Sequence, residues 1–170
     1  GRTGYWHVGV PPSGPMDDLS HRLANRVVGN AEHAAALELT TSGPSLRFPD
    51  GAVIALGGAD MALTVDGRPA PRWEPVVVPA GATVSVGAVV GPGLRATLAV
   101  RGGIDEPAYL GSRSTFTLAQ FGGHGGRCLV PGDLLVLGDD ASDPPVGLPP
   151  GMAPDIGAAW EIGVLVGPHS

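Results

Sequence analysis

Short strand-forming segments separated by turn residues run through most of the sequence. They are rich in β-branched and other apolar residues, and Gly, Pro or Asp stands between one and the next. Many short strands at this spacing favour a closed or nearly closed β-barrel. The expected strands are SLRF (45–48), AVIALGG (52–58), MALTV (61–65), PVVVP (75–79), TVSVGAVV (83–90), LRATLAVRGG (94–103), RCLVP (127–131) and LLVLG (134–138).

Turn chemistry indicates where some of these strands form hairpins. The Asp-Gly pair in VDGRP (65–69) suits the two positive φ angles of a type I′ turn, so a two-residue hairpin is expected there. VVVPAGATVSVG (76–87) and CLVPGDLLVLG (128–138) share a plan of strand, turn with Pro and Gly, and strand. Two equivalent hairpins in a barrel would explain this similarity, and so would ordinary turn chemistry; the residues leave both explanations open.

One helix is expected ahead of the strands. Leu19, Leu23 and Val27 recur every four residues, which predicts a helix over about 16–28. A short helical turn is expected over AEHAAALE (31–38). The predicted fold is therefore mainly β, a β-barrel with one or two short helices.

The segment in front of the helix is a stiff polar loop. Gly and Pro in GVPPSGP (9–15) prevent regular structure, and the carboxylates Asp17 and Asp18 follow at the helix entrance. Carboxylates in that place cap a helix and interact favourably with its dipole. Loops held by a rigid scaffold also carry binding sites more often than other segments do. The residues leave both interpretations open.

Two later loops combine glycine with polar side chains. In YLGSRSTF (109–116), Arg113 lies between two serines, a set that suits a bound carboxylate or ureido oxygen as well as a solvated turn. GGHGGR (122–127) resembles backbone-amide clusters that bind anions, and is equally typical of a turn between strands.

Composition argues against several classes of partner. A net charge of −6 without any basic run argues against nucleic acid, and no apolar run approaches the ~20 residues that span a bilayer. The five histidines are scattered without the spacing of metal ligands, so no metal site is expected. All ten basic residues are arginine, so this chain cannot carry a Schiff-base, P-loop or biotinyl lysine.

The single cysteine, Cys128, cannot form an internal disulfide, which fits a reducing compartment and a cytoplasmic location. Within its apolar run it is expected to be a small buried residue on a strand rather than a nucleophile.

Composition also divides the chain. Residues 1–140 are expected to form one domain, residues 141–157 a Pro/Gly-rich linker, and residues 158–170 the start of a second domain. The chain lacks an initiator Met and ends just after a new strand-like segment begins. It is therefore expected to be incomplete at both ends.

Three stretches resemble the biotin-dependent carboxyltransferase family, which includes the carboxyltransferase domain of urea carboxylase (urea amidolyase), allophanate hydrolase subunit 2 and one of the 5-oxoprolinase subunits. The first and third look closer to the urea carboxylase branch. The stretches are GRTGYWHVGVPPSGPMDDLSHRLANRVVGN (1–30), AVRGGIDEPAYLGSRSTFTLAQFGGHGGRCLVPGD (99–133) and WEIGVLVGPHS (160–170).

The resemblance implies a fold and a reaction. The fold would be a pair of cyclophilin-like β-barrel subdomains, with subdomain A in residues 1–140 and the start of a truncated subdomain B in residues 158–170. The reaction would be transfer of a carboxyl group from carboxybiotin to urea, which gives allophanate. Carboxybiotin would come from a biotin carboxyl carrier domain charged with ATP by a biotin carboxylase domain or subunit. The fragment alone is then expected to be inactive, and no metal is implied.

The resemblance also implies where the site lies. The loop at 11–18, GSRS (111–114) and GGHGG (122–126) are the polar, glycine-rich loops that carry the resemblance, so we expect them to meet at a common cleft. Urea offers N–H donors and one carbonyl acceptor, so its site needs acceptors on one side and donors on the other. Fixed backbone N–H groups would stabilise charge on the ureido oxygen of biotin. The catalytic residues implied are Ser13, Asp17 and Arg113, and the substrate-binding residues are Gly14, Asp18, Asn25, Ser112 and His124.

Two other functions stay open. One is a component of a 5-oxoprolinase, an ATP-dependent hydrolase that opens a small lactam and in which this chain would act together with partner subunits. The other is a non-catalytic regulatory module that binds a protein partner.

Overall fold

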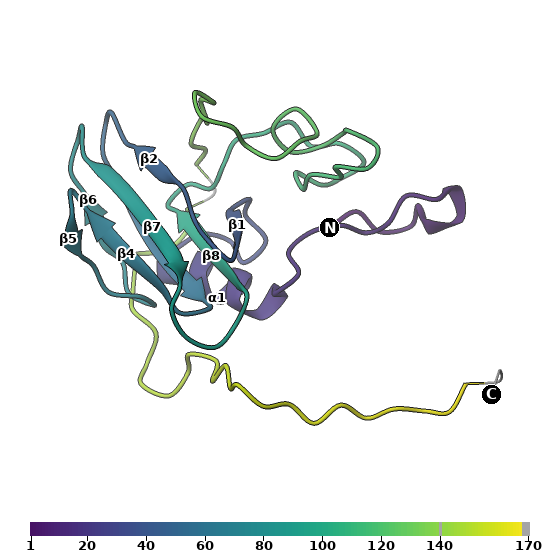
Figure 1. Cartoon of the computed structure of the whole chain (residues 1–170). Coiled ribbons are helices and arrows are strands. Elements are labelled where there is room, and N and C mark those ends of the chain that lie inside the picture. Colours follow the sequence, from purple (N-terminus) through teal and green to yellow (C-terminus); the bar gives the residue numbers. More distant parts are fainter. Residues whose placement is uncertain (140, 168–170) are drawn as a thin grey trace.

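Two antiparallel sheets of four strands each carry the fold (Figure 1). The computed structural model describes residues 1–139 and 141–167. The mainly β prediction is confirmed, and the strands predicted between residues 45 and 103 are all present. The first sheet has the order β1 (Leu37–Thr40), β8 (Arg95–Val100), β3 (Ala52–Gly58) and β6 (Val76–Val78); the second has the order β2 (Ser45–Arg47), β7 (Thr83–Val89), β4 (Met61–Val65) and β5 (Arg68–Pro69).

Strand β3 is apolar along its whole length, and β8 is apolar except at Arg95 and Thr97, because both faces of their sheet are buried. Ile54 and Leu56 on β3 and Leu98 on β8 lie in the core between the two sheets. Ala55 and Ala99, one residue out of step, point to the opposite face and pack against the helix. The small alanine side chains let the helix lie close to this face. Burial on both faces explains why AVIALGG lacks polar alternation.

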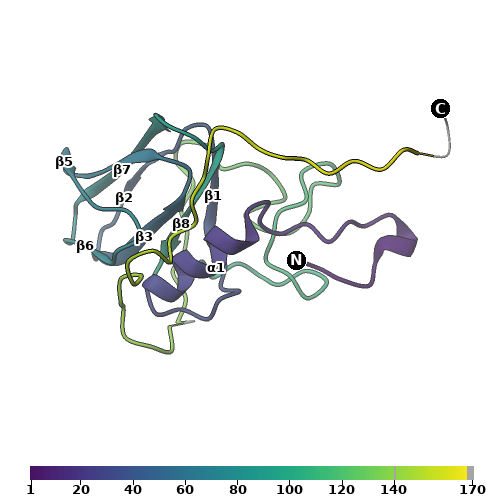
Figure 2. The same cartoon turned by 90° about the horizontal axis from the view of Figure 1, so that it is seen from below.

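The helix α1 (Asp18–Val27) covers the outer face of the first sheet (Figure 2). The helix predicted over about 16–28 is present, with Leu23, Ala24 and Val27 buried. Leu19 is 49% exposed. The reason is geometric, since Leu19 lies at the edge of the stripe that faces the sheet.

Local turn chemistry between β4 and β5 is as predicted. Asp66 and Gly67 have φ angles of 48° and 75°, the two positive values of a type I′ turn, and Val65 pairs with Arg68 across it. The helical turn predicted over 31–38 is wrong in its second half, because β1 already begins at Leu37 and pairs with β8.

The two strands predicted at 127–131 and 134–138 are wrong. Over this segment the structure has only an isolated bridge between Ile104 and Leu137. Apolar residues form a strand only where a neighbouring strand supplies hydrogen bonds, and none of the eight described strands pairs with this segment. Cys128 is accordingly exposed, not buried.

The chain after β8 contains loops and returns to the helix. Ser142 N donates to Gly29 O at 2.9 Å, and Val146 N donates to Val27 O at 2.9 Å, so the first part of the predicted linker packs against α1. Leu148 N also donates to Trp73 O at 3.2 Å, and the last described part of the chain, in yellow, runs away from the sheets in both views (Figures 1 and 2).

The domain division of the chain stays a prediction. Its boundary at residue 140 and the last three residues of WEIGVLVGPHS lie outside the described residues, and no helix or strand occurs in 158–167. Within 1–139 and 141–167, no helix is long and apolar enough to cross a bilayer.

Candidate functional site

The two carboxylates at the helix entrance have separate structural partners. Asp17 is the N-cap of α1, and its Oδ1 accepts a hydrogen bond from Ser20 N at 3.0 Å. Asp18 forms an ion pair with Arg22 Nε at 2.9 Å on the exposed side of the helix. Among the described residues Asp17 Oδ2 accepts no hydrogen bond, so the cap leaves one oxygen for a ligand. The catalytic role of Asp17 stays a prediction.

Glu38 on β1 fixes the end of the opening loop. Its Oε1 accepts from Met16 N at 2.7 Å and from Asp17 N at 3.2 Å, while Oε2 pairs with Arg95 Nη1 at 3.2 Å. The carboxylate therefore ties the start of the helix to the first sheet and orients Asp17.

Arg2 brings the opening loop and the later loops together. Its backbone N donates to Pro12 O at 2.6 Å, and its Nη2 donates to Ser114 O at 2.5 Å. Its Nε lies 3.4 Å from Tyr109 O, and its Cζ lies 5.1 Å from the centroid of the Phe121 ring. In both overall views the opening segment and the loops after β8 project from the same side of the sheets (Figures 1 and 2).

The predicted site residues next to these contacts lie in tight turns. Ser13 and Gly14 follow Pro12 with positive φ angles of 53° and 96°. Ser112 is buried, and its Oγ lies 2.8 Å from Ser114 Oγ. The contacts of Arg2 thus place Ser13 and Gly14 near the loop that contains Ser112.

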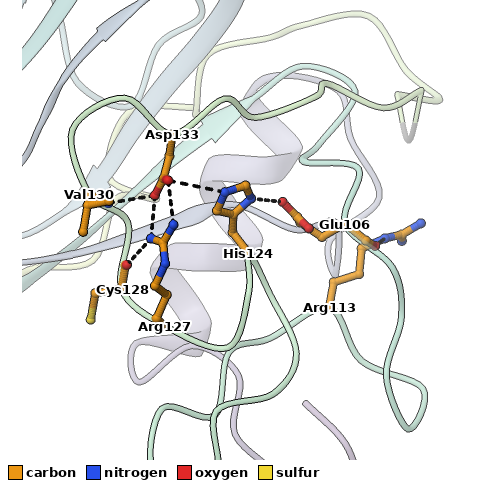
Figure 3. Close-up of polar contacts among 7 residues, drawn as sticks. All are labelled: Glu106, Arg113, His124, Arg127, Cys128, Val130 and Asp133. Atoms are coloured by element: carbon orange, nitrogen blue, oxygen red, sulfur yellow. Dashed lines mark hydrogen bonds and ion pairs between the residues drawn. The ribbon is translucent and has the colours of Figure 1, made fainter.

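His124 lies between two carboxylates (Figure 3). Its Nδ1 is 2.7 Å from Glu106 Oε1, and its Nε2 is 3.6 Å from Asp133 Oδ1. Asp133 in turn accepts two hydrogen bonds from Arg127, both at 2.7 Å, and one from Val130 N at 2.8 Å. The Glu106 carboxylate fixes the His124 ring at Nδ1, and the Asp133 carboxylate lies near Nε2 but beyond hydrogen-bond distance.

Arg113 belongs to the same group. Its Nε donates to Glu106 O at 2.8 Å (Figure 3). Its Nη2 lies 3.7 Å from Asp105 Oδ1. The side chain is 39% exposed, so part of it lies at the surface. Two predicted site residues therefore contact Glu106, Arg113 through its backbone carbonyl and His124 through its carboxylate.

Asp133 gives a prediction about pH. Hydrogen bonds from Arg127 and from Val130 N hold the pKa of the Asp133 carboxyl well below its ordinary value. Because the unfolded chain then binds the proton more tightly, the stabilisation is present above the ordinary Asp pKa of about 3.9 and is lost as the pH falls toward the folded-state pKa. We expect Asp133→Asn to lower the melting temperature at neutral pH, with the difference from wild type shrinking below about pH 4.

Thermal melts of the 170-residue chain across this pH range measure the effect. Asp50→Asn, which removes an exposed carboxylate in the loop before β3, is the matched control. A difference between wild type and Asp133→Asn that stays constant with pH would contradict the prediction.

Asn25 is buried in the core instead of facing the loops. Its Nδ2 donates to Ala34 O at 3.0 Å, and its Oδ1 accepts from Asn30 Nδ2 at 2.9 Å. Burial lowers the pKa of the neighbouring His21, which favours the neutral ring whose Nε2 lies 3.2 Å from Asn25 Nδ2. Asn30 also donates to Val100 O, so this network joins the helix to β8.

Asn25, predicted as a substrate-binding residue, is thus part of this buried network, and the structure does not bring it to Ser13 or Arg113.

Sequence reasoning missed several residues of this group. No local sequence pattern marks these residues as part of a site. All but one of them could have been found because they lie in the stretches that resemble the family. These residues are Arg2, Glu38, Glu106, Arg127 and Asp133, of which Glu38 alone lies outside those stretches.

Surface grooves occur elsewhere on the molecule. One of about 310 Å³ lies between Asp60 and Arg72, and one of about 530 Å³ lies between β5 and β6. Neither groove contains a predicted site residue, and the predicted common cleft stays a prediction. No group of three His, Cys, Asp or Glu side chains within 1–139 and 141–167 is arranged to hold a metal ion.

Comparison with known proteins gives the family. The sequence matches the model of the carboxyltransferase domain, subdomain A and B, over residues 8–170. It is 48% identical to urea amidolyase of Saccharomyces cerevisiae over 99% of this chain, and 35% identical to a 5-oxoprolinase subunit of Haemophilus influenzae over 82%. The crystal structure of Kluyveromyces lactis urea carboxylase matches 99% of this chain with a TM-score of 0.91 at 46% identity.

These relatives are longer proteins. The chain spans about 10% of the S. cerevisiae protein, 45% of the H. influenzae protein and 16% of the K. lactis chain. The family match nevertheless extends over nearly all of its residues. The resemblance is thereby confirmed: the chain belongs to the family of carboxyltransferase domains with subdomains A and B.

Proposed function

We propose that this chain is part of the carboxyltransferase of a biotin-dependent urea carboxylase, which transfers the carboxyl group of carboxybiotin to urea and gives allophanate. One observation carries the proposal. The chain is 48% identical to a urea amidolyase over 99% of its length, against 35% identity over 82% for the 5-oxoprolinase subunit of H. influenzae. The same comparison favours urea over a small lactam as the acceptor.

The polar groups of the loops suit urea. Asp17 has a carboxylate oxygen left to accept a urea N–H, and Asp18 lies beside it. The Ser13 hydroxyl and the Gly14 amide are donors for the urea carbonyl. Two further donors, Arg113 and Ser112, lie on the 109–116 loop, to which Arg2 connects the opening loop.

The donor set also fits the carboxylated ureido ring of biotin. Carboxybiotin would supply the activated carboxyl group when a carrier domain delivers it. The Arg113 guanidinium and the backbone amides of residues 122–125 can donate to its oxygens. The Glu106 backbone carbonyl holds Arg113 in place, and the Glu106 carboxylate holds His124.

The remaining steps belong to other parts of the enzyme. A biotin carboxylase domain or subunit would use ATP to charge biotin on a carrier, because this chain has no lysine to which biotin can be attached. We infer a cytoplasmic enzyme from the single exposed thiol, Cys128, which has no cysteine partner.

The proposed function is tested with the complete protein that contains this chain. We expect urea, and not 5-oxoproline, to stimulate ATP turnover in the presence of bicarbonate, with allophanate as the product. The control is the same protein with its carrier lysine replaced, which prevents biotin attachment and should abolish turnover. Stimulation by 5-oxoproline alone would contradict the proposal in favour of lactam opening, and a stable protein complex without any turnover would favour a regulatory module.

A further inference from the structure

Arg2 has contacts that connect three segments far apart in the sequence. Its backbone holds the opening loop at Pro12 O, and its guanidinium holds the carbonyls of Tyr109 and Ser114, the second of which is 112 residues away. Its Cζ lies over the Phe121 ring, which itself contacts the Tyr109 ring at a centroid distance of 4.9 Å. The side chain therefore occupies the junction of all three loops.

The free-energy cost of burying the Arg2 guanidinium argues against a role limited to stability. Arg2 is 1% exposed, and its Nη1 has no hydrogen-bond partner among the described residues. No carboxylate of residues 1–139 or 141–167 acts on its charge, and burial lowers its pKa. A buried cation without a counter-ion is expensive, and apolar replacement of buried charges is often neutral or stabilising. An arginine in this place therefore points to a geometric requirement.

The geometry explains why the residue is arginine. The planar guanidinium donates in fixed directions and stacks on an aromatic ring at the same time, which a lysine ammonium does not. Gly122, with a φ of 69°, completes the junction, because a side chain at this position would meet both the Ser114 carbonyl and the Arg2 guanidinium. The contacts at Gly122 thus require a residue without a side chain beside Arg2.

We propose that Arg2 is a positioning residue of the carboxyltransferase site. It holds the turn with Ser13 and Gly14 against the loop with Ser112 and Arg113, so that donors from both loops meet one substrate. It acts through these residues and does not itself contact the reacting atoms. This inference rests on the proposed function, since the substrate in question is urea.

Arg2→Met in the complete protein tests the inference. The apolar side chain fills a similar volume but cannot bridge the carbonyls. We expect urea-dependent turnover to fall by about ten- to hundredfold, because a shift of about 1 Å in a site can cost ~10²-fold in rate. The KM for urea should rise, while biotin-dependent ATP cleavage and the melting temperature stay close to wild type.

Hydrogen exchange gives a readout that does not depend on the reaction. In Arg2→Met the amides of Ser112, Phe116 and Phe121 should exchange faster, and those of β3 and β8 should be unchanged. Arg47→Met, which removes an exposed arginine on β2, is the matched control and should leave both exchange and turnover unchanged. Unchanged loop exchange in Arg2→Met would overturn the inference.

Arg2→Lys separates geometry from charge. We expect Arg2→Lys to lose activity as Arg2→Met does. Wild-type activity in Arg2→Lys would overturn a role for the planar guanidinium with its fixed donor directions.

Faster exchange of the loop amides in Arg2→Met together with normal urea turnover would also overturn the inference, because the loops would then not form the site. If wild type acts on a lactam and not on urea, the proposed function fails, and the same variants assayed with that lactam still decide the role of Arg2.

Discussion

Asp17→Asn in the complete enzyme is expected to lower urea-dependent turnover by about ten- to hundredfold and to leave ATP-dependent charging of biotin intact. Loss of a charged hydrogen bond costs ~1.5–3 kcal/mol, which gives this range of rates if the bond forms in the transition state. The structure also indicates that this substitution should not disrupt the helix. Asp17 caps α1 through Oδ1 alone, and Asn is also a good N-cap, so the helix should be retained.

Two assays, each normalised to folded protein, test this prediction. Urea-dependent ATP turnover reports the carboxyltransferase step, and biotin-dependent ATP cleavage reports the charging step. Asp50→Asn, which removes an exposed carboxylate in the loop before β3, should change neither. If Asp17→Asn shows normal urea-dependent turnover, Asp17 serves the helix and not the substrate.

Leu98→Ala should cause the largest loss of stability, about 2–5 kcal/mol, through the lost burial and the cavity left behind. Leu98 is completely buried on β8, where it stands between Leu37 of β1 and Leu56 of β3 in the centre of the first sheet. Unfolding of the 170-residue chain in guanidinium chloride measures the change, since urea is the proposed substrate and is unsuitable as a denaturant.

Leu118→Ala provides the matched control for the same chemical change. Leu118 is 89% exposed, so its replacement should alter the free energy of unfolding by less than about 0.5 kcal/mol. A loss below about 1 kcal/mol in Leu98→Ala would mean that the two sheets do not enclose one packed core.

Local sequence predicted the elements that depend on neighbouring residues. The type I′ turn at Asp66 and Gly67 follows from backbone preferences of two adjacent residues. Strands such as β3 and the core of α1 follow from apolar patterns within one segment. The segment at 127–138 has an equally apolar pattern and forms no strand, because a strand also depends on a partner elsewhere in the chain.

The candidate site was predictable only in part. Family resemblance pointed to Ser13, Asp17, Arg113 and His124, but the residues that orient them were missed. Nothing local to Glu106 or Asp133 shows that both contact one imidazole, because these residues come from loops on either side of His124. Asn25 was predicted as a site residue but is part of the core. Its side-chain amide bonds to Asn30, which in turn bonds to β8, so it joins α1 to that strand.

By itself, then, the sequence determined the mainly β class, the position of the helix and the absence of a lysine for ATP or biotin chemistry. Each of these depends on residue type and local spacing. Only the tertiary structure decided which polar groups meet. Arg2 and Ser114 are 112 residues apart, and their hydrogen bond depends on the path of every strand between them. Contacts of this kind come from the packing of the whole chain, and no local pattern encodes them.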